Sequence, residues 1–127
     1  MRDVAFYRVP PAPQELHYAF RMNTRGVLAE LRAVGYLRRH GYRIRHLRWR
    51  GGGGEIDLVA EENGLTVFVE VKSSPRLGDG AQRVDREKIA HLRSAAEAYM
   101  RQNGMENCRF DILEESDAGF RLIRNAF

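Results

Sequence analysis

The sequence predicts a mixed α/β fold in which a mixed sheet is flanked by helices. Two segments, 23–40 and 85–102, repeat apolar residues at helical spacing. Five shorter segments are rich in β-branched and aromatic residues, as strands are. The length of 127 residues corresponds to a single domain. We therefore expect one domain at 23–127, with the order helix, three strands, helix and two strands, preceded by an N-terminal arm at 1–22.

The arm is predicted because three prolines between positions 10 and 13 exclude a regular helix or a central strand. We expect it to pack on the domain or on a second subunit. The first helix follows, with Asn23 or Thr24 as its N-cap and with Gly41 just beyond its end.

Glu30 is a candidate site residue on this first helix. On a helical wheel, the buried stripe consists of Val27, Leu31 and Val34, and a glutamate lies at its edge. In this place Glu30 either points toward a metal site, as a further ligand or as an acceptor for water, or it extends outward or pairs with a neighbouring arginine. The sequence leaves both alternatives open.

The segments 54–60 and 65–72 are expected to pair as a β-hairpin, because the link between them ends in an Asn-Gly pair that suits a tight reversal. Side chains alternate between the two faces along a strand. When the apolar faces of the two strands lie together, Asp57, Glu70 and Lys72 share the other side. Two carboxylates and an ammonium therefore converge.

A divalent cation would explain this convergence, because like carboxylates repel and are costly to desolvate. Mg²⁺, or Mn²⁺ in its place, is typically held by one or two carboxylates with phosphate oxygens and waters. The predicted ligands are Asp57, Glu70 and the carbonyl of Val71, and Glu30 is a further candidate. Lys72 would orient the attacking water or stabilise the transition state of phosphodiester hydrolysis. The alternative is a solvated strand face with an ordinary Glu-Lys pair.

The second helix is expected to begin after the N-cap Asp85 and to run to about Gln102. Lys88 lies in its first turn, where it reaches the scissile phosphate or Glu70, or extends past the helix edge. We include Lys88 and Glu55 as auxiliary candidates.

The remaining segments connect or close the sheet. Residues 73–82 contain proline and glycine and are interpreted as a mobile loop. The four glycines at 51–54 lack the Gly-Lys-Ser/Thr ending of a nucleotide-binding loop, so we expect a flexible connection and no nucleotide cofactor. The strands at 108–113 and 120–123 close the sheet, and Asp111 is interpreted as a surface residue.

A block of positive charge indicates a polyanionic partner. Residues 31–54 include seven arginines and two histidines but no acid. Such a block suits the phosphates of DNA, although charged runs often form an ordinary solvated surface. The predicted DNA-binding residues are Arg38, Arg39, Arg43, Arg45, Arg48, Arg50 and, in the loop after the hairpin, Arg76.

Composition excludes other classes of protein. The single cysteine, Cys108, excludes an internal disulfide, and no Cys/His group has the spacing of a zinc site. The sequence has no apolar run long enough to cross a membrane and no apolar core of a signal peptide. We therefore expect a cytoplasmic protein with no membrane partner.

Two motifs support a resemblance to a known family. The segments GEIDLVA at 54–60 and FVEVK at 68–72, with the RFD segment at 109–111, resemble the YraN-like family of bacterial proteins. Through that family the chain resembles the restriction-endonuclease-like PD-(D/E)XK nuclease superfamily, which includes the archaeal Holliday junction resolvases. The resemblance implies an αβββαβ core and an endonuclease-like domain at 23–127.

The same resemblance implies roles for individual residues. Asp57, Glu70 and Lys72 match the superfamily's Asp and Glu-x-Lys metal-binding nuclease motif, and Glu30 matches its helical glutamate. Ser73 follows where an arginine is usual in the family, and Arg76 is the nearest substitute.

Two functions are therefore expected from the sequence. The first is a Mg²⁺-dependent, structure-selective DNA endonuclease resembling Holliday junction resolvases, which is favoured because all four catalytic candidates are present. It would act on branched DNA as a homodimer, with the contact formed by the arm and the strand edge near Phe127. The second is a nucleic-acid-binding or protein-interaction module that keeps the fold without turnover.

Overall fold

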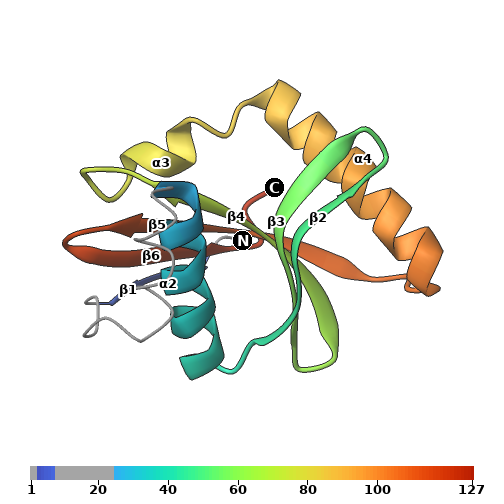
Figure 1. Cartoon of the computed structure of the whole chain (residues 1–127), viewed down its shortest axis with the longest axis horizontal. Helices are drawn as coiled ribbons and strands as arrows, with labels where there is room; N and C mark the ends of the chain where they lie inside the picture. The colour runs from blue at the N-terminus through green and yellow to red at the C-terminus, as the bar shows by residue number, and fades with distance from the viewer. Residues whose placement is uncertain (1–2, 8–24) are drawn as a thin grey trace.

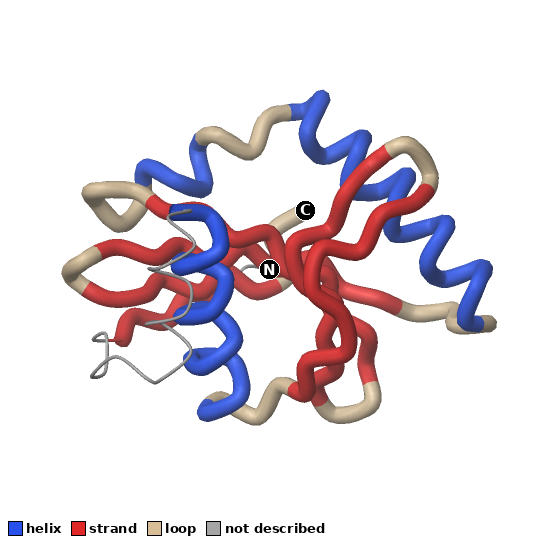
Figure 2. Tube along the Cα trace, in the orientation of Figure 1, coloured by secondary structure: helices blue, strands red, loops and turns tan. Residues whose placement is uncertain are grey.

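The structure is a computed structural model that describes residues 3–7 and 25–127, and the side chains from residue 28 onward (Figures 1 and 2). The described strands form one six-stranded sheet in the order β1-β6-β5-β4-β3-β2, in which β4 and β5 are the one parallel pair. The predicted mixed α/β fold is confirmed. The elements along the chain are β1 (Asp3–Tyr7), α2 (Arg25–Arg39), β2 (Arg43–Gly51), β3 (Gly54–Glu62), β4 (Leu65–Ser73), α3 (Asp79–Gln82), α4 (Arg86–Asn103), β5 (Cys108–Ser116) and β6 (Gly119–Arg124).

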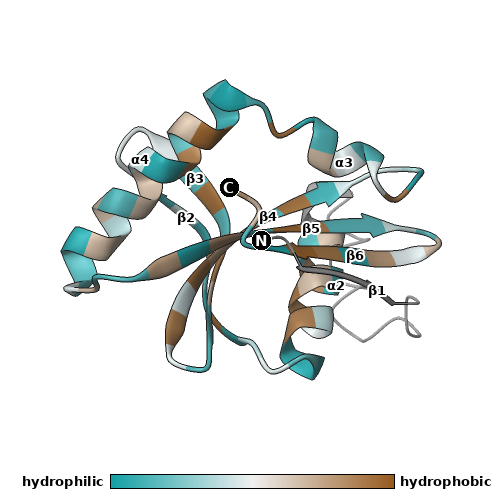
Figure 3. Cartoon of the chain, turned by 180° about the vertical axis from the view of Figure 1, so that it is seen from behind, coloured by the Kyte–Doolittle hydropathy of each residue, from teal (hydrophilic) through white to brown (hydrophobic). Residues whose placement is uncertain are grey.

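Each face of the sheet has its own hydrophobic core. On one face Val67 and Val69 of β4 pack with residues of α2, and on the other Phe68 packs with Ala95 and Tyr99 of α4. Along α4, hydrophobic and hydrophilic positions alternate as expected for a helix that lies on a sheet (Figure 3). None of the described helices has the length and apolar content needed to cross a bilayer.

Strand β1 was not expected from the sequence. It pairs antiparallel with β6, with Asp3 opposite Arg124 and Tyr7 opposite Phe120. An edge strand thus lies within the segment interpreted as an arm, and it covers the edge of β6 on which we had placed the dimer contact. The homodimer stays a prediction, and the rest of the arm and the N-caps Asn23 and Thr24 lie outside the described residues.

The buried stripe of α2 includes the predicted Val34 but otherwise differs from the predicted one, and the side chain of Val27 lies outside the described residues. Ala29, Ala33 and Leu37, spaced four residues apart, lie against the sheet, whereas Leu31 is only half-buried. Because alanine side chains are small, the helix face that carries them can approach the strands closely. This face therefore lies on the sheet, rather than the face with the larger side chains. As a consequence, Glu30 lies further inside the interface than its predicted place at the edge.

The glycines between β2 and β3 form a tight turn rather than a flexible connection. Gly52 and Gly53 have φ values of 58° and 80°, which suit the reversal. A Cβ atom on Gly52 would lie 2.4 Å from the carbonyl oxygen of Ser94, and one on Gly54 would lie 2.6 Å from that of His91. The glycines therefore let the end of the hairpin lie directly on the backbone of α4.

Asp111 is completely buried, so its interpretation as a surface residue is wrong. Its carboxylate accepts hydrogen bonds from the Arg109 guanidinium at 2.8 and 2.9 Å, from the Tyr42 hydroxyl at 2.9 Å and from the Asn125 backbone N–H at 2.9 Å. Arg109 also donates to Glu62 at 2.7 Å. From Asp111 to Ser116 every residue of β5 is buried, so a polar residue in this part of the strand is buried whichever way it points.

Candidate active site at the fork of the sheet

The sheet divides into a fork where β3 and β4 separate. The two strands pair from Glu62 opposite Leu65 to Leu58 opposite Val69, and beyond this point β3 continues with β2 alone. Strand β4 instead stays with β5 as far as Ser73. Figure 1 shows the β2–β3 hairpin rising beside α4 while β4 runs toward α3. The fork is therefore open to side chains from both strands.

Asp57 and Glu70 lie where the strands begin to separate. The Asp57 carboxylate accepts a hydrogen bond of 2.9 Å from the backbone N–H of Val71. This bond takes the place of a ladder bond that the diverging strands do not form. A side chain thus joins β3 to β4 at the fork, and its carboxylate is held next to that of Glu70.

Glu70 is a buried carboxylate whose two oxygens have different surroundings. Its side chain is 3% exposed, and Oε1 lies 3.6 Å from Lys72 Nζ and 3.4 Å from Lys88 Nζ. Oε2 is buried and has no hydrogen-bond partner among the described residues. Lys88 comes from the first turn of α4. The sequence left open whether its side chain reaches the site or extends past the helix edge, and in the structure it lies beside Glu70.

The pKa of Glu70 is raised to about 7, first by burial and then by the neighbouring Asp57 charge, while Lys88 and Lys72 act in the opposite direction. A carboxyl group with this pKa is only partly ionised at neutral pH. A bound cation would favour the ionised form and displace the proton.

This raised pKa makes the stability of the metal-free protein dependent on pH. In the unfolded chain Glu70 titrates near its ordinary value of 4.5, so between pH 4.5 and 7 the native state binds more protons. We expect the free energy of unfolding to fall as the pH rises through this range, by at most about 1.4 kcal/mol per pH unit for one group. Urea denaturation of wild type and Glu70→Gln, in the presence of a chelator and at several pH values, gives the free energy of unfolding of each as a function of pH. The difference between these two curves measures the contribution of Glu70. Parallel curves would contradict the assignment.

Glu30 pairs with an arginine, which is the second of its two predicted alternatives. Its Oε2 accepts a hydrogen bond of 2.8 Å from Arg48 Nε. Burial raises its pKa, the Arg48 hydrogen bond and charge lower it, and Asp57 and Glu55 raise it further. Glu30 therefore lies within the field of the fork carboxylates, although its own carboxylate is held by Arg48.

The other acidic candidate, Glu55, accepts a hydrogen bond of 2.6 Å from Arg50. Within residues 3–7 and 25–127, no group of three or more His, Cys, Asp or Glu side chains is arranged to hold a metal ion. The fork therefore offers two carboxylates, Asp57 and Glu70. This donor set fits a hard cation such as Mg²⁺, which keeps several waters and needs only one or two carboxylates, and the partnerless Glu70 Oε2 supplies a free donor.

The loop after β4 is anchored rather than mobile, by a residue that sequence analysis missed. Glu114 is completely buried on β5 and accepts hydrogen bonds from the N–H groups of Gly78 and Ala81 at 2.9 and 3.0 Å and from Arg121 at 2.6 Å. These bonds hold α3 so close to β4 that a Cβ atom on Gly80 would lie 2.8 Å from Lys72 Cβ. No pattern in the sequence marked Glu114, because β5 carries two further acids, Asp111 and Glu115.

The arginine block is spread over α2 and β2, and four of its seven arginines are ion-paired. Arg32, which is not among the predicted DNA-binding residues, pairs with Glu115. Arg45 pairs with Glu61, Arg48 with Glu30 and Arg50 with Glu55. The remaining predicted DNA-binding arginines are exposed and form no ion pair with another described residue; they are Arg38, Arg39, Arg43 and Arg76.

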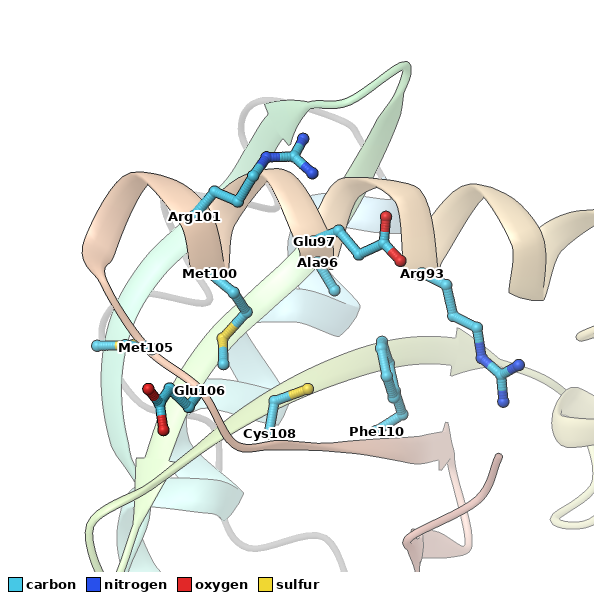
Figure 4. A pocket seen from close by; sticks show the side chains of 9 residues that line it. All are labelled: Arg93, Ala96, Glu97, Met100, Arg101, Met105, Glu106, Cys108 and Phe110. Atoms are coloured by element: carbon cyan, nitrogen blue, oxygen red, sulfur yellow. The ribbon is translucent and has the colours of Figure 1, made fainter.

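A cavity of about 430 Å³ lies between the C-terminal half of α4 and the start of β5 (Figure 4). Its lining includes Met100, Met105 and Phe110, and charged side chains such as Arg93 and Glu97 also border it. None of the fork residues lines it. This apolar recess is thus separate from the carboxylate pair.

Comparison with known proteins gives a family for this chain. The model of the family described as "Uncharacterised protein family UPF0102" matches residues 29–114. A UPF0102 protein from Shewanella loihica is 39% identical over 107 residues, covering 82% of this chain and 94% of the relative. One from Persephonella marina is 36% identical over 107 residues, covering 81% and 92%. One from Rhodopseudomonas palustris is 43% identical over 91 residues, covering 72% and 67%. The chain therefore belongs to the UPF0102 family.

Proposed function

We propose that the protein is a divalent-metal-dependent DNA endonuclease whose active site is the fork between β3 and β4. The observation that supports this most is Glu70: a carboxylate oxygen without a partner is buried beside Asp57, while two ammonium groups face the other oxygen. Burying such a group is costly unless a ligand compensates it. A cation supplies that compensation.

In this proposal Asp57 and Glu70 hold Mg²⁺ or Mn²⁺, and the carbonyl of Val71 is a further ligand. The bound cation lowers the pKa of a water molecule and neutralises charge on the phosphoryl oxygens. Lys72 lies beside Glu70 without replacing a metal ligand, so its ammonium is available to orient the attacking water or to stabilise the charge of the transition state. Lys88 adds a second positive charge on the α4 side.

The edge strand β2 is suited to a polyanion rather than to another strand. Its register shifts between Ile44 and His46, and Arg48 has a positive φ of 52°, so its edge is irregular. Irregularity and positive charge both disfavour pairing with a further strand. The arginines of β2 suit the phosphates of a DNA backbone. The affinity for DNA should therefore fall steeply as the salt concentration rises.

The proposed substrate is branched DNA, cut in a structure-selective way by a homodimer. A four-way junction has two strands to cut in a roughly two-fold arrangement, and the fork supplies one site per chain. The alternative function is a DNA-binding module without turnover. The pairing of Glu30 with Arg48 favours this alternative, because it leaves the carboxylate pair without a third acid.

Mn²⁺ titration of the metal site tests the proposal. We expect Asp57→Asn and Glu70→Gln to lose the calorimetric heat of Mn²⁺ binding that wild type shows, and to lose cleavage of junction, forked or linear DNA. Asp57→Asn keeps an oxygen that can accept the Val71 N–H, so the fork should stay folded. The matched control is Glu97→Gln, which changes an exposed carboxylate of α4 that borders the apolar cavity and not the fork. Equal heats for wild type and both fork variants would refute the metal site, and metal binding without cleavage would favour the binding module.

A further inference from the structure

We propose that Arg48 binds a phosphate of the nucleic acid at the fork and that Glu30 is the residue that positions its guanidinium. This inference rests on the proposed function and extends it, because it assigns Glu30 to the substrate side of the site instead of the metal. It also gives Arg48 a role different from that of the other arginines of β2, which would attract the nucleic acid only through their positive charge.

The backbone at Arg48 places its side chain at the fork. Its φ of 52° is in the left-handed region, which residues with a side chain rarely adopt. In the β2–β3 register it falls between the pairs Leu47–Leu58 and Trp49–Ile56, and therefore opposite Asp57. The strained conformation thus occurs next to the first of the two fork carboxylates.

The guanidinium of Arg48 is held on one side and available on the other. Its Nε donates to Glu30 Oε2 at 2.8 Å, which uses one of five N–H donors. The two terminal nitrogens make no hydrogen bond to another described residue, and the side chain is 45% exposed. A planar guanidinium whose two terminal nitrogens make no hydrogen bond to a described residue can donate to two oxygens of a phosphate.

The charges around Arg48 connect it to the metal site. Its pKa is raised first by the hydrogen bond and charge of Glu30 and also by Glu55 and Asp57. The guanidinium therefore lies within the electrostatic field of Asp57. A phosphate bound to Arg48 would be close to the position where the fork carboxylates hold a cation.

The other two ion pairs of β2 take their acidic partners from a different element than the Arg48 pair does. Glu61 and Glu55, the partners of Arg45 and Arg50, lie on the adjacent strand β3. Glu30 comes from α2, and its side chain is only 14% exposed. Glu61 is almost as buried, at 19% exposed, so the difference lies in what the pair joins. The Glu30–Arg48 pair joins the edge strand to a helix, so α2 restrains the guanidinium from outside the β2–β3 hairpin, and this restraint is what positioning requires.

The experiment compares Arg48→Gln with Arg45→Gln. Arg45 lies on the same strand as Arg48 and also has an acidic partner, so its substitution removes an equivalent charge. Binding to a fluorescent junction DNA in EDTA and single-turnover cleavage with Mn²⁺ at saturating protein are measured. We expect both variants to bind more weakly, with a log-log salt slope smaller by about 0.9. Only Arg48→Gln should also lower the maximal cleavage rate, by more than about tenfold, and Arg48→Lys should not rescue it because an ammonium lacks the planar fork.

Glu30→Gln separates positioning from metal binding. We expect its Mn²⁺ affinity to equal that of wild type, while its maximal cleavage rate falls part of the way toward that of Arg48→Gln, because the amide oxygen can still accept the Nε–H but lacks the charge that holds the guanidinium. The NMR signal of the Arg48 Nε–H group should shift when junction DNA is added in EDTA to wild type, and should shift less in Glu30→Gln.

Three results would overturn the inference. They are equal maximal rates for Arg48→Gln and Arg45→Gln, a weaker Mn²⁺ affinity in Glu30→Gln, and an Arg48 signal that DNA leaves unchanged. If wild type itself cuts no DNA, the nuclease proposal fails separately. The NMR shift in EDTA then still decides whether Arg48 binds phosphate.

Discussion

Lys72→Ala is expected to lower the single-turnover rate of DNA cleavage by about a hundredfold to a thousandfold, the range found when a group that stabilises transition-state charge is removed. Metal and DNA binding should change little. Lys72 Nζ lies 3.6 Å from Glu70 Oε1, so the ammonium is close to the proposed metal ligand without being a ligand itself. The rate is measured with Mn²⁺ at matched occupancy of metal and DNA.

The controls for Lys72 separate its position from its charge. Removing either lysine beside Glu70 removes a group that lowers the Glu70 pKa, so the rates are compared well above pH 7, where the carboxyl group is ionised. Lys72→Arg should recover only part of the rate, because a broad guanidinium replaces a compact ammonium. Lys88→Ala removes the equivalent charge on α4. A wild-type rate in Lys72→Ala would show that this lysine is only a partner of Glu70.

Asp111→Ala is expected to lower the free energy of unfolding by about 3–5 kcal/mol, the usual loss when one partner of a buried ion pair is removed. The Asp111 side chain is completely buried, and its removal leaves the Arg109 guanidinium, the Tyr42 hydroxyl and the Asn125 N–H without this acceptor. Chemical denaturation measures the change.

A matched control for Asp111 is Asp117→Ala, in the exposed turn between β5 and β6, which should cost less than about 0.5 kcal/mol. Tyr42→Phe should fall between the two, because it removes one donor and leaves the Arg109 pair intact. A loss below about 1 kcal/mol in Asp111→Ala would mean that the network contributes little to stability.

The elements near the site were predictable because their determinants are local. The Asn63-Gly64 turn, the alternating faces of β3 and β4 and the N-cap Asp85 each depend on residues a few positions apart. The register that places Asp57 beside Glu70 follows from the apolar alternation alone. Sequence analysis therefore located the carboxylate pair.

The failed interpretations concern contacts between residues far apart in sequence. Asp111 looked like a surface residue because its partner Tyr42 lies 69 positions away. Glu114 fixes a loop 33 to 36 positions earlier in the chain, which no pattern within either segment indicates. Glu30 illustrates the same limit, because its direction depended on which face of α2 lies on the sheet.

The single parallel pair of the described sheet has a consequence for the order of folding. Strands β2, β3 and β4 are consecutive and antiparallel, whereas β4 and β5 are separated by residues 74–107. Local pairings close short loops and form early, and parallel pairings must wait for the crossover. Asp57 and Glu70 therefore meet when the local meander forms, before α4 brings Lys88 to them. During folding, Lys72 is thus the ammonium group that faces the two carboxylates while the meander stands alone, and Lys88 adds the second positive charge when the helix docks.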